Sequence, residues 1–264
     1  METKGESHAE YNVREFLAFA GSSVLTDNSS VFVGTGLPII AAMLAQRTHA
    51  PGLLLVFEAG GIGPQMPELA VSVGDSRTFH RAIAASSMHD VMSLSQLGYV
   101  DYGFLGAAQI DCFGNINTTS IGAHAKPLVR LPGSGGANDV GSFACKLVII
   151  IANQSIRTFV SHLDFITTPG YLDGPGARER AGLAANTGPY RVISQLGIYD
   201  FEPETRRMRI ISLHPGIQIS DALKNSGFEI LVGPPPVVTP APTEEALKIM
   251  RNDLDPAGII LLKT

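Results

Sequence analysis

The polar residue with the clearest chemical potential is Glu58, which directly follows the apolar run LLLVF (53–57) and precedes Ala59-Gly60-Gly61. A strand without polar alternation is typical of a parallel sheet that is covered on both faces. Packing explains a carboxylate at the end of such a strand poorly, and glycines beside it allow another molecule to approach the backbone. A nucleophile or a base is one interpretation of this pattern, but a single carboxylate more often has a structural role. A helix cap or an isolated ion pair is the structural alternative.

A second candidate is the glycine-rich loop Gly133-Ser-Gly-Gly-Ala-Asn138. Turns of this kind can present backbone N–H groups to an anion or to a developing oxyanion. A simple tight turn is the alternative interpretation. The loop is not a phosphate-binding P-loop, because no Gly-Lys-Ser/Thr follows it. The segment GTGLP (34–38) lacks the third glycine of a dinucleotide-binding fingerprint, so a nicotinamide cofactor is unsupported.

A third group of polar residues lies within the glycine-punctuated stretch 107–122. Gln109, Asp111, Asn115 and Asn117 could line a pocket. They could equally satisfy the backbone groups of turns, which is the more frequent role of such residues.

Composition and motifs exclude several classes of function. The chain has 264 residues, 45% of them hydrophobic and 16% charged, with no Trp and a net charge of −5, so a nucleic-acid partner is not expected. It contains neither an HExxH metal motif nor a Gly-x-Ser-x-Gly nucleophile elbow. Cys112 and Cys145 have no metal-ligand spacing, and we expect both to be buried and reduced. We expect Arg178 and Arg180 to lie on a solvated or interface face rather than on a phosphate.

We also expect no membrane association and a cytoplasmic location. No run of about 18 apolar residues occurs, and residues 1–16 are polar without the apolar centre of a signal peptide.

The elements that must position these residues alternate between strand and helix. Strands are predicted at 31–33, 53–57, 102–105, 147–151, 158–160, 191–194, 208–212 and 229–232, and helices at 13–20, 38–47, 89–97 and 244–252. Residues 197–201 look like part of an antiparallel hairpin, and the proline-rich stretch 233–242 like an extended surface crossing. The pattern predicts an α/β fold with an open, mostly parallel sheet and flanking helices. Ligands bind beyond the carboxyl ends of the strands in such sheets.

An ordered set of segments resembles the B (β-type) subunits of class I CoA-transferases, the glutaconate CoA-transferase group. The segments are VGTGLP (33–38), VFEAGG (56–61), GAAQIDCFGNINTTSIG (106–122), GSGGAND (133–139), DFITTPGYLDGPGARERAGL (164–183), GIYDFEPETRRM (197–208) and SGFEI (226–230). They span nearly the whole chain, so the resemblance implies one CoA-transferase domain over residues 1–264.

The resemblance implies that Glu58 is the catalytic glutamate. It would attack an acyl-CoA to give an acyl-glutamyl anhydride, then an enzyme–CoA thioester that passes CoA to a second carboxylic acid, such as a glutaconate-like dicarboxylate. The loop residues Gly135, Gly136, Ala137 and Asn138 would bind the oxyanion or CoA. Further pocket candidates are Gly60, Gly61, Gln109 and Asn115.

The resemblance also implies an A-type (α) partner subunit in a hetero-oligomer. Coenzyme A would be a substrate and covalent intermediate, with no permanently bound cofactor and no metal. Two alternatives remain open. One is a hydrolase or decarboxylase of the same family that uses Glu58 as a base, and the other is a non-catalytic binding subunit.

Overall fold

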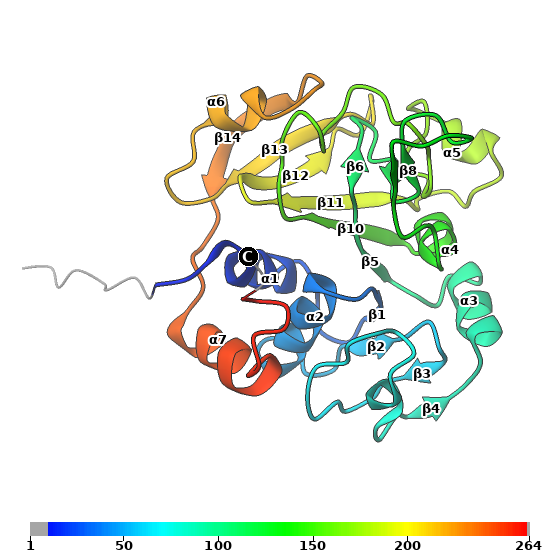
Figure 1. Ribbon diagram of the computed structural model, residues 1–264, viewed down its shortest axis with the longest axis vertical. Helices are drawn as coiled ribbons and strands as arrows, with labels where there is room; N and C mark the ends of the chain where they lie inside the picture. The colour runs from blue at the N-terminus through cyan, green and yellow to red at the C-terminus, as the bar shows by residue number, and fades with distance from the viewer. Residues whose placement is uncertain (1–9, 263–264) are drawn as a thin grey trace, which may run out of the picture.

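The computed structural model describes residues 10–262, so residues 1–9 of the polar N-terminal stretch lie outside the described residues. One ten-stranded sheet runs through the molecule in the order β14-β13-β12-β11-β10-β5-β1-β2-β3-β4 (Figure 1). Its strands are β1 (Ser30–Val33), β2 (Leu54–Val56), β3 (Gly61–Ile62), β4 (Ala84–Ala85), β5 (Tyr102–Gly106), β10 (Lys146–Ile151), β11 (Pro189–Ser194), β12 (Gly197–Phe201), β13 (Met208–Leu213) and β14 (Leu231–Val238).

The helices and two small hairpins surround this sheet. The helices are α1 (Val13–Ser22), α2 (Leu37–Arg47), α3 (Met88–Gln96), α4 (Ala137–Phe143), α5 (Ala177–Arg180), α6 (Ile219–Lys224) and α7 (Glu244–Lys248), with a 3₁₀ turn η1 (Ser76–Phe79) and a π-helical turn η2 (Ile249–Leu254). The hairpins pair β6 (Gln109–Ile110) with β7 (Ile116–Asn117), and β8 (Ser120–Ile121) with β9 (Val129–Arg130).

The centre of the sheet is parallel, as the apolar runs predict. Strands β2, β1, β5, β10 and β11 pair in parallel, whereas β12 forms antiparallel pairs with β11 and β13. The predicted mostly parallel α/β sheet and the hairpin at 197–201 are therefore confirmed.

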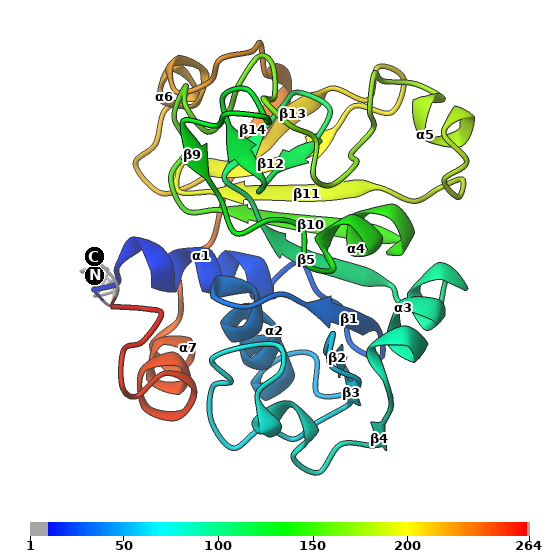
Figure 2. The ribbon, with the colours of Figure 1, turned by 45° about the vertical axis from the view of Figure 1, so that its right-hand side comes forward.

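Successive side chains of the central strands enter two different cores. Val31 and Val33 pack in a cluster with Leu17 of α1 and Ile40 of α2, whereas Phe32 packs in a second cluster. That second cluster contains residues of α3 and α4. Figure 2 shows α1 and α2 apart from α3 and α4, which is consistent with helices covering both faces of the sheet. Burial on both faces explains why these strands are continuously apolar.

One expected strand is absent, one begins later than expected, and the expected burial of the two cysteines is wrong. Residues 158–160 form no strand, because Thr158 and Phe159 are held in turn hydrogen bonds and Phe159 makes only an isolated bridge with Ile110. The strand predicted at 229–232 begins at Leu231 and continues through Gly233 and the three prolines at 234–236. It is an edge strand, where the missing N–H of proline is tolerated. Neither Cys112 nor Cys145 is fully buried, although both are free thiols.

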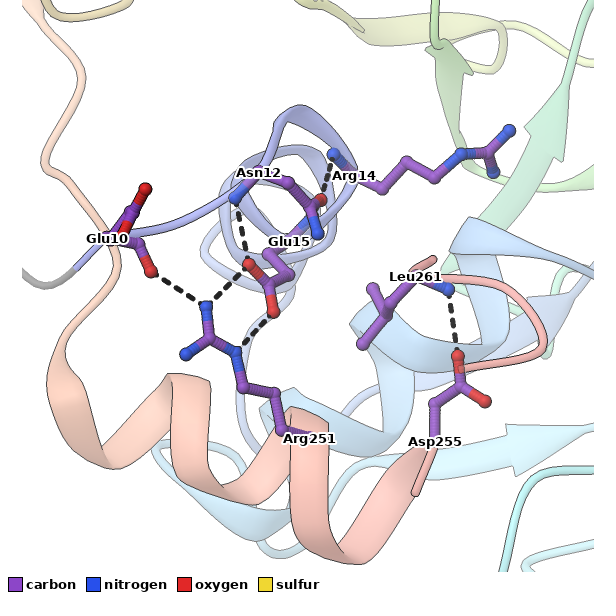
Figure 3. A network of polar contacts seen from close by, with 7 residues as sticks. All are labelled: Glu10, Asn12, Arg14, Glu15, Arg251, Asp255 and Leu261. Carbon is purple, nitrogen blue, oxygen red and sulfur yellow. Dashed lines mark hydrogen bonds and ion pairs between the residues drawn. The ribbon is translucent and has the colours of Figure 1, made fainter. Parts of the chain in front are cut away.

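The two ends of the described chain are joined by an ion pair (Figure 3). The Nε and Nη2 atoms of Arg251 in η2 donate to Glu15 of α1 at 2.6 and 2.9 Å. Glu15 is 2% exposed and also accepts from the Asn12 amide, which completes a capping box at the start of α1. Burial raises the pKa of Glu15, but the hydrogen bonds from Arg251 and Asn12 outweigh it and leave the pKa below its ordinary value. The buried Glu15 carboxylate thus links two segments that are 236 residues apart in the chain.

A buried histidine makes the stability of this fold depend on pH. The Nε2–H of His214 donates to the Ser194 carbonyl at 2.7 Å, and its Nδ1 accepts from the Thr239 hydroxyl at 3.0 Å, as a neutral imidazole does. Burial lowers the pKa of His214 from 6.5 to about 4. The neutral His214 therefore contributes to the free energy of unfolding. This contribution is complete above pH 6.5 and is lost as the pH falls towards 4, because between these values the unfolded chain binds a proton and the folded chain does not.

We therefore expect His214→Gln to remove a pH dependence of roughly 3 kcal/mol in the free energy of unfolding. Chemical denaturation between pH 4 and 6.5 measures it, since these are the two pKa values of the histidine. The exposed His124 provides the control, and His124→Gln should keep the wild-type slope. Equal slopes in the wild type and His214→Gln would contradict the prediction.

Candidate active site

The sheet reverses its direction of winding between two adjacent strands. β1 leads through α2 to β2 on one side, whereas β5 is followed by α4 and then β10 on the other side. Such a switch point opens a crevice at the carboxyl ends of the strands, where open α/β sheets bind ligands.

An open pocket of about 510 Å³ occupies this crevice. The ends of β1, β2 and β5 and the loop before α4 all contribute to its wall. The lining residues are Phe32, Val33, Gly34, Thr35, Glu58, Ser72, Val73, Leu105, Gly106, Ala107, Ala108, Thr118, Pro132, Gly133, Ser134, Gly135, Gly136, Ala137 and Val140. Glu58 is the only ionisable side chain among these described residues. The structure thus brings the acidic strand end and the glycine-rich loop together.

Glu58 projects from a tight turn between β2 and β3. The Gly60 amide donates to the Phe57 carbonyl and the Phe57 amide to the Gly61 carbonyl, each at 2.9 Å. A Cβ at Gly60 would lie 2.0 Å from the Ser86 carbonyl oxygen, and one at Gly61 would lie 2.0 Å from that of Thr78. The close approach that these glycines allow is therefore made by the chain itself and not by another molecule. Gly60 and Gly61 lie beside the pocket lining and shape the turn that carries Glu58.

The Glu58 carboxylate lies against the glycine-rich loop. A Cβ at Gly136 would lie 3.2 Å from both Cδ and Oε1 of Glu58, and one at Gly135 would lie 4.0 Å from Oε1. Within residues 10–262 the half-buried Glu58 carboxylate has neither a hydrogen bond nor an ion pair. The structure therefore shows neither the helix cap nor the ion pair of the alternative interpretation.

The loop leaves the amides of Ser134, Gly135 and Gly136 without a hydrogen-bond partner among the described residues. The Ala137 amide donates to the Ser134 carbonyl at 2.9 Å, and the Asn138 amide faces the Ser134 hydroxyl at 3.3 Å. The amides of Gly135 and Gly136 have no partner in the described chain. Of the four loop residues expected to bind an oxyanion or CoA, Gly135 and Gly136 therefore offer free donors. Asn138 instead directs its side-chain amide to the Thr167 carbonyl at 3.0 Å.

Gln109 and Asn115 do not line this pocket. Gln109 is buried and bonds to Asp164 and Asn117. Asn115 is 1% exposed and accepts from the Gly170 amide at 2.8 Å while it donates to Asp111. Burial raises the pKa of Asp111. These side chains satisfy loop backbones and one another, as the alternative interpretation of this stretch predicted.

Several residues that line the pocket were not predicted from the sequence. Thr35 follows β1 as Glu58 follows β2, so the same strand-end signal could have identified it. Ser72 and Thr118 also place hydroxyl groups on the wall. Ser72 lies in a loop without a motif, and no sequence signal would have found it.

The expectation that Arg178 lies on a solvated or interface face is wrong. Arg178 is 2% exposed, and burial lowers its pKa. Its guanidinium donates to the carbonyls of Gly141 and Ser142 in α4 at 3.2 and 3.1 Å. It also donates to the carbonyls of Pro169 and Gly170 at 3.1 and 2.8 Å. Arg178 therefore joins the helix after the glycine-rich loop to the segment at 169–170.

We expect Arg178→Met to lower the free energy of unfolding by at least about 3 kcal/mol, because several buried carbonyls lose their donor. Arg180, two positions later, is exposed. Arg180→Met should stay within about 0.5 kcal/mol of the wild type. Urea titration of both variants measures the difference, and equal stabilities would contradict the role assigned to Arg178.

Neither metal ligation nor membrane spanning is found in the part of the chain that the structure describes. Residues 10–262 contain no group of three or more His, Cys, Asp or Glu side chains that could hold a metal ion. None of the helices in this range is long and apolar enough to cross a membrane.

A family model described as Coenzyme A transferase matches residues 16–225. The chain therefore belongs to the coenzyme A transferase family. It is 40% identical over 242 residues to the B-type subunit of 3-oxoadipate CoA-transferase from Pseudomonas knackmussii, a match that covers 91% of this chain and 92% of the relative.

The B-type subunit of glutaconate CoA-transferase from Acidaminococcus fermentans is 34% identical over 254 residues, or 94% of each chain. The crystal structure of glutaconate coenzyme A-transferase from that organism matches with a TM-score of 0.91 and 32% identity, over 98% of this chain and 100% of the other. A more distant relative is the IpdB subunit of a cholesterol ring-cleaving hydrolase from Rhodococcus jostii, 26% identical over 258 residues and 96% of each chain.

Proposed function

We propose that this chain is the B-type subunit of a CoA-transferase, with Glu58 as the nucleophile that carries CoA between two carboxylic acids. The observation that supports this most directly is the unpaired Glu58 carboxylate beside the free amides of Gly135 and Gly136, in a pocket at the switch point of the sheet. The relatives at 34% and 40% identity are both CoA-transferase subunits, whereas the hydrolase subunit is 26% identical. The transferase is therefore favoured over the hydrolase.

The proposed reaction begins with attack by a Glu58 oxygen on the carbonyl of an acyl-CoA. The C–S bond breaks, which gives an acyl-glutamyl anhydride and CoA thiolate. The thiolate then attacks the glutamyl carbonyl, so the first carboxylate leaves and CoA becomes a thioester of Glu58. A second carboxylate reverses these steps and leaves as the new acyl-CoA.

Each step passes through a tetrahedral oxyanion that needs hydrogen-bond donors. The free amides of Gly135 and Gly136 are assigned to this role, and one such donor contributes about 3 kcal/mol to lowering a barrier. The amides of Ala137 and Asn138 are already engaged by Ser134, so these two residues shape the loop. The acyl chain would lie along Val73, Leu105 and the other apolar residues of the wall.

The proposal includes an A-type partner subunit and treats residues 1–264 as one domain. The pocket is open, and its described lining has no Lys, Arg or His to pair with the phosphates of CoA or with a second carboxylate on the acid. An A-type partner would supply such a cation and exclude water. A dicarboxylate is the proposed class of acid, since the relatives at 34% and 40% identity are named for glutaconate and 3-oxoadipate. The ten-stranded sheet through the described chain supports a single domain.

Mass spectrometry tests the proposal. The chain is purified with its A-type partner, incubated with an acyl-CoA in the absence of an acceptor acid, and digested. The expected product is CoA attached through a thioester to the peptide that contains Glu58, and added acceptor acid should discharge it. Accumulation of free acid and CoA without this adduct would contradict the transferase and support hydrolysis.

A further inference from the structure

The segment at 164–183 was singled out by its sequence, but the proposed chemistry does not use it. Thr167 within this segment is 3% exposed, and it contacts the neighbourhood of the glycine-rich loop through both its hydroxyl and its carbonyl. Because Gly135 and Gly136 can act as donors only if their amides face the oxyanion, whatever holds this loop bears on catalysis.

The first end of the loop is held through Thr118. The Thr118 amide donates to the Thr167 hydroxyl at 2.9 Å. Thr118 in turn makes a reciprocal pair of hydrogen bonds with Gly133, its hydroxyl donating to the Gly133 carbonyl at 2.9 Å and its carbonyl accepting from the Gly133 amide at 2.8 Å. The Thr167 hydroxyl also pairs with that of Thr119 at 2.7 Å. The hydroxyl therefore orients the residue that fixes the start of the loop.

The second end of the loop is held directly. The Asn138 side-chain amide donates to the Thr167 carbonyl at 3.0 Å. Thr168 packs against α4, the helix that follows the loop, since a Cβ at Gly141 of α4 would lie 2.0 Å from Cγ2 of Thr168. The Thr167 amide is itself anchored on the Ile116 carbonyl at 2.9 Å. One buried residue thus connects both ends of the loop to the hairpin formed by β6 and β7.

We propose that Thr167 is a positioning residue for the reaction: it sets the distance and direction of the Gly135 and Gly136 amides relative to Glu58. This inference rests on the proposed function of the loop. Loss of the hydroxyl frees the Thr118 amide and loosens the first end of the loop, while the backbone contact with Asn138 persists. A small displacement of the donors then raises the barrier without weakening the binding of the substrate.

The test compares Thr167→Val with Thr167→Ser in the two-subunit enzyme, with an acyl-CoA and an acid that the wild type uses. Valine keeps the shape of the side chain and removes the hydroxyl, whereas serine keeps the hydroxyl. We expect kcat and the rate of adduct formation on Glu58 to fall about 10- to 100-fold in Thr167→Val, with KM for the acyl-CoA within about threefold of the wild type. Thr167→Ser should recover most of the rate.

Thr239 provides a matched control. It is also 3% exposed, and its hydroxyl bonds to Ser212 and His214, which do not line the pocket. Thr239→Val should lower the melting temperature without lowering kcat. If Thr167→Val does not fold, Asn138→Ala at an exposed position removes the hydrogen bond from the loop to the Thr167 carbonyl, and it should lower kcat in the same way.

The outcomes separate the two proposals. An adduct in the wild type that forms at an undiminished rate in Thr167→Val, or in Asn138→Ala if that is the variant used, would contradict the positioning role alone. Loss of rate in Thr239→Val equal to that in Thr167→Val would also contradict it, because general destabilisation would then be the cause. Absence of the adduct in the wild type would contradict the proposed function itself.

Discussion

Glu58→Gln is expected to reduce turnover by at least about 10⁴-fold, because a neutral amide cannot attack the acyl-CoA carbonyl and no thioester can form at this position. The change is nearly isosteric. The Glu58 carboxylate has no hydrogen bond or ion pair within residues 10–262, so the folded structure loses no contact. We therefore expect the free energy of unfolding to stay within about 0.5 kcal/mol of the wild type.

The measurement is CoA transfer by the chain together with the proposed A-type partner, with thermal unfolding recorded in parallel. Glu68 provides the matched control, because its exposed carboxylate makes only a 4.0 Å contact with Arg77. Glu68→Gln should turn over at the wild-type rate. Wild-type turnover in Glu58→Gln would mean that this chain is a non-catalytic subunit, whereas activity retained in Glu58→Asp without an acceptor acid would favour a base over a nucleophile.

Gly136→Ala should produce the second largest loss, about 10²- to 10³-fold in kcat. The backbone of Gly136 has a φ of −80°, which alanine adopts without strain. The added methyl group would instead lie 3.2 Å from Cδ and Oε1 of Glu58 and 2.6 Å from Cε of Met92. Met92 can move, since Cε is the end of a flexible side chain. The carboxylate and the loop must then separate, which moves the nucleophile away from the free amides.

Steady-state kinetics of Gly136→Ala beside Gly74→Ala checks this prediction. A Cβ at Gly74 meets nothing within 4 Å, so that substitution should leave kcat unchanged. The double variant Gly136→Ala with Met92→Ala removes one of the two steric contacts. If the double variant recovers the wild-type rate, Met92 and not Glu58 is the group that the methyl displaces, and the proposed contact between nucleophile and loop is contradicted.

Much of the fold follows from local patterns in the chain. The continuous apolar runs at β1, β2 and β10 predict strands that are buried on both faces, and the structure places their alternate side chains in two cores. Pro38 correctly marks the first turn of α2. The strand expected at 158–160 is absent because turn hydrogen bonds hold those residues, and the strand expected at 229–232 is shifted along an edge of the sheet.

For the site, the sequence alone singles out Glu58 and the glycine-rich loop, because an acidic strand end and a run of glycines are local features. Their proximity is not local. Glu58 and Gly136 are far apart in the chain, and they meet beside the carboxyl ends of the parallel strands β2, β1 and β5, where the loop before α4 is held by remote segments.

Tertiary structure alone decided which polar residues serve a pocket and which serve the scaffold. Gln109, Asn115 and Arg178 have the residue types of ligand-binding groups, yet each is buried with its hydrogen bonds made to loops of the same chain. Gly60 and Gly61 likewise leave space for backbone carbonyls of the same chain and not for a ligand. A buried polar group must be paired, but its partners come from remote segments. The sequence therefore determined the chemistry that was available, and the packing determined which groups remained free to perform it.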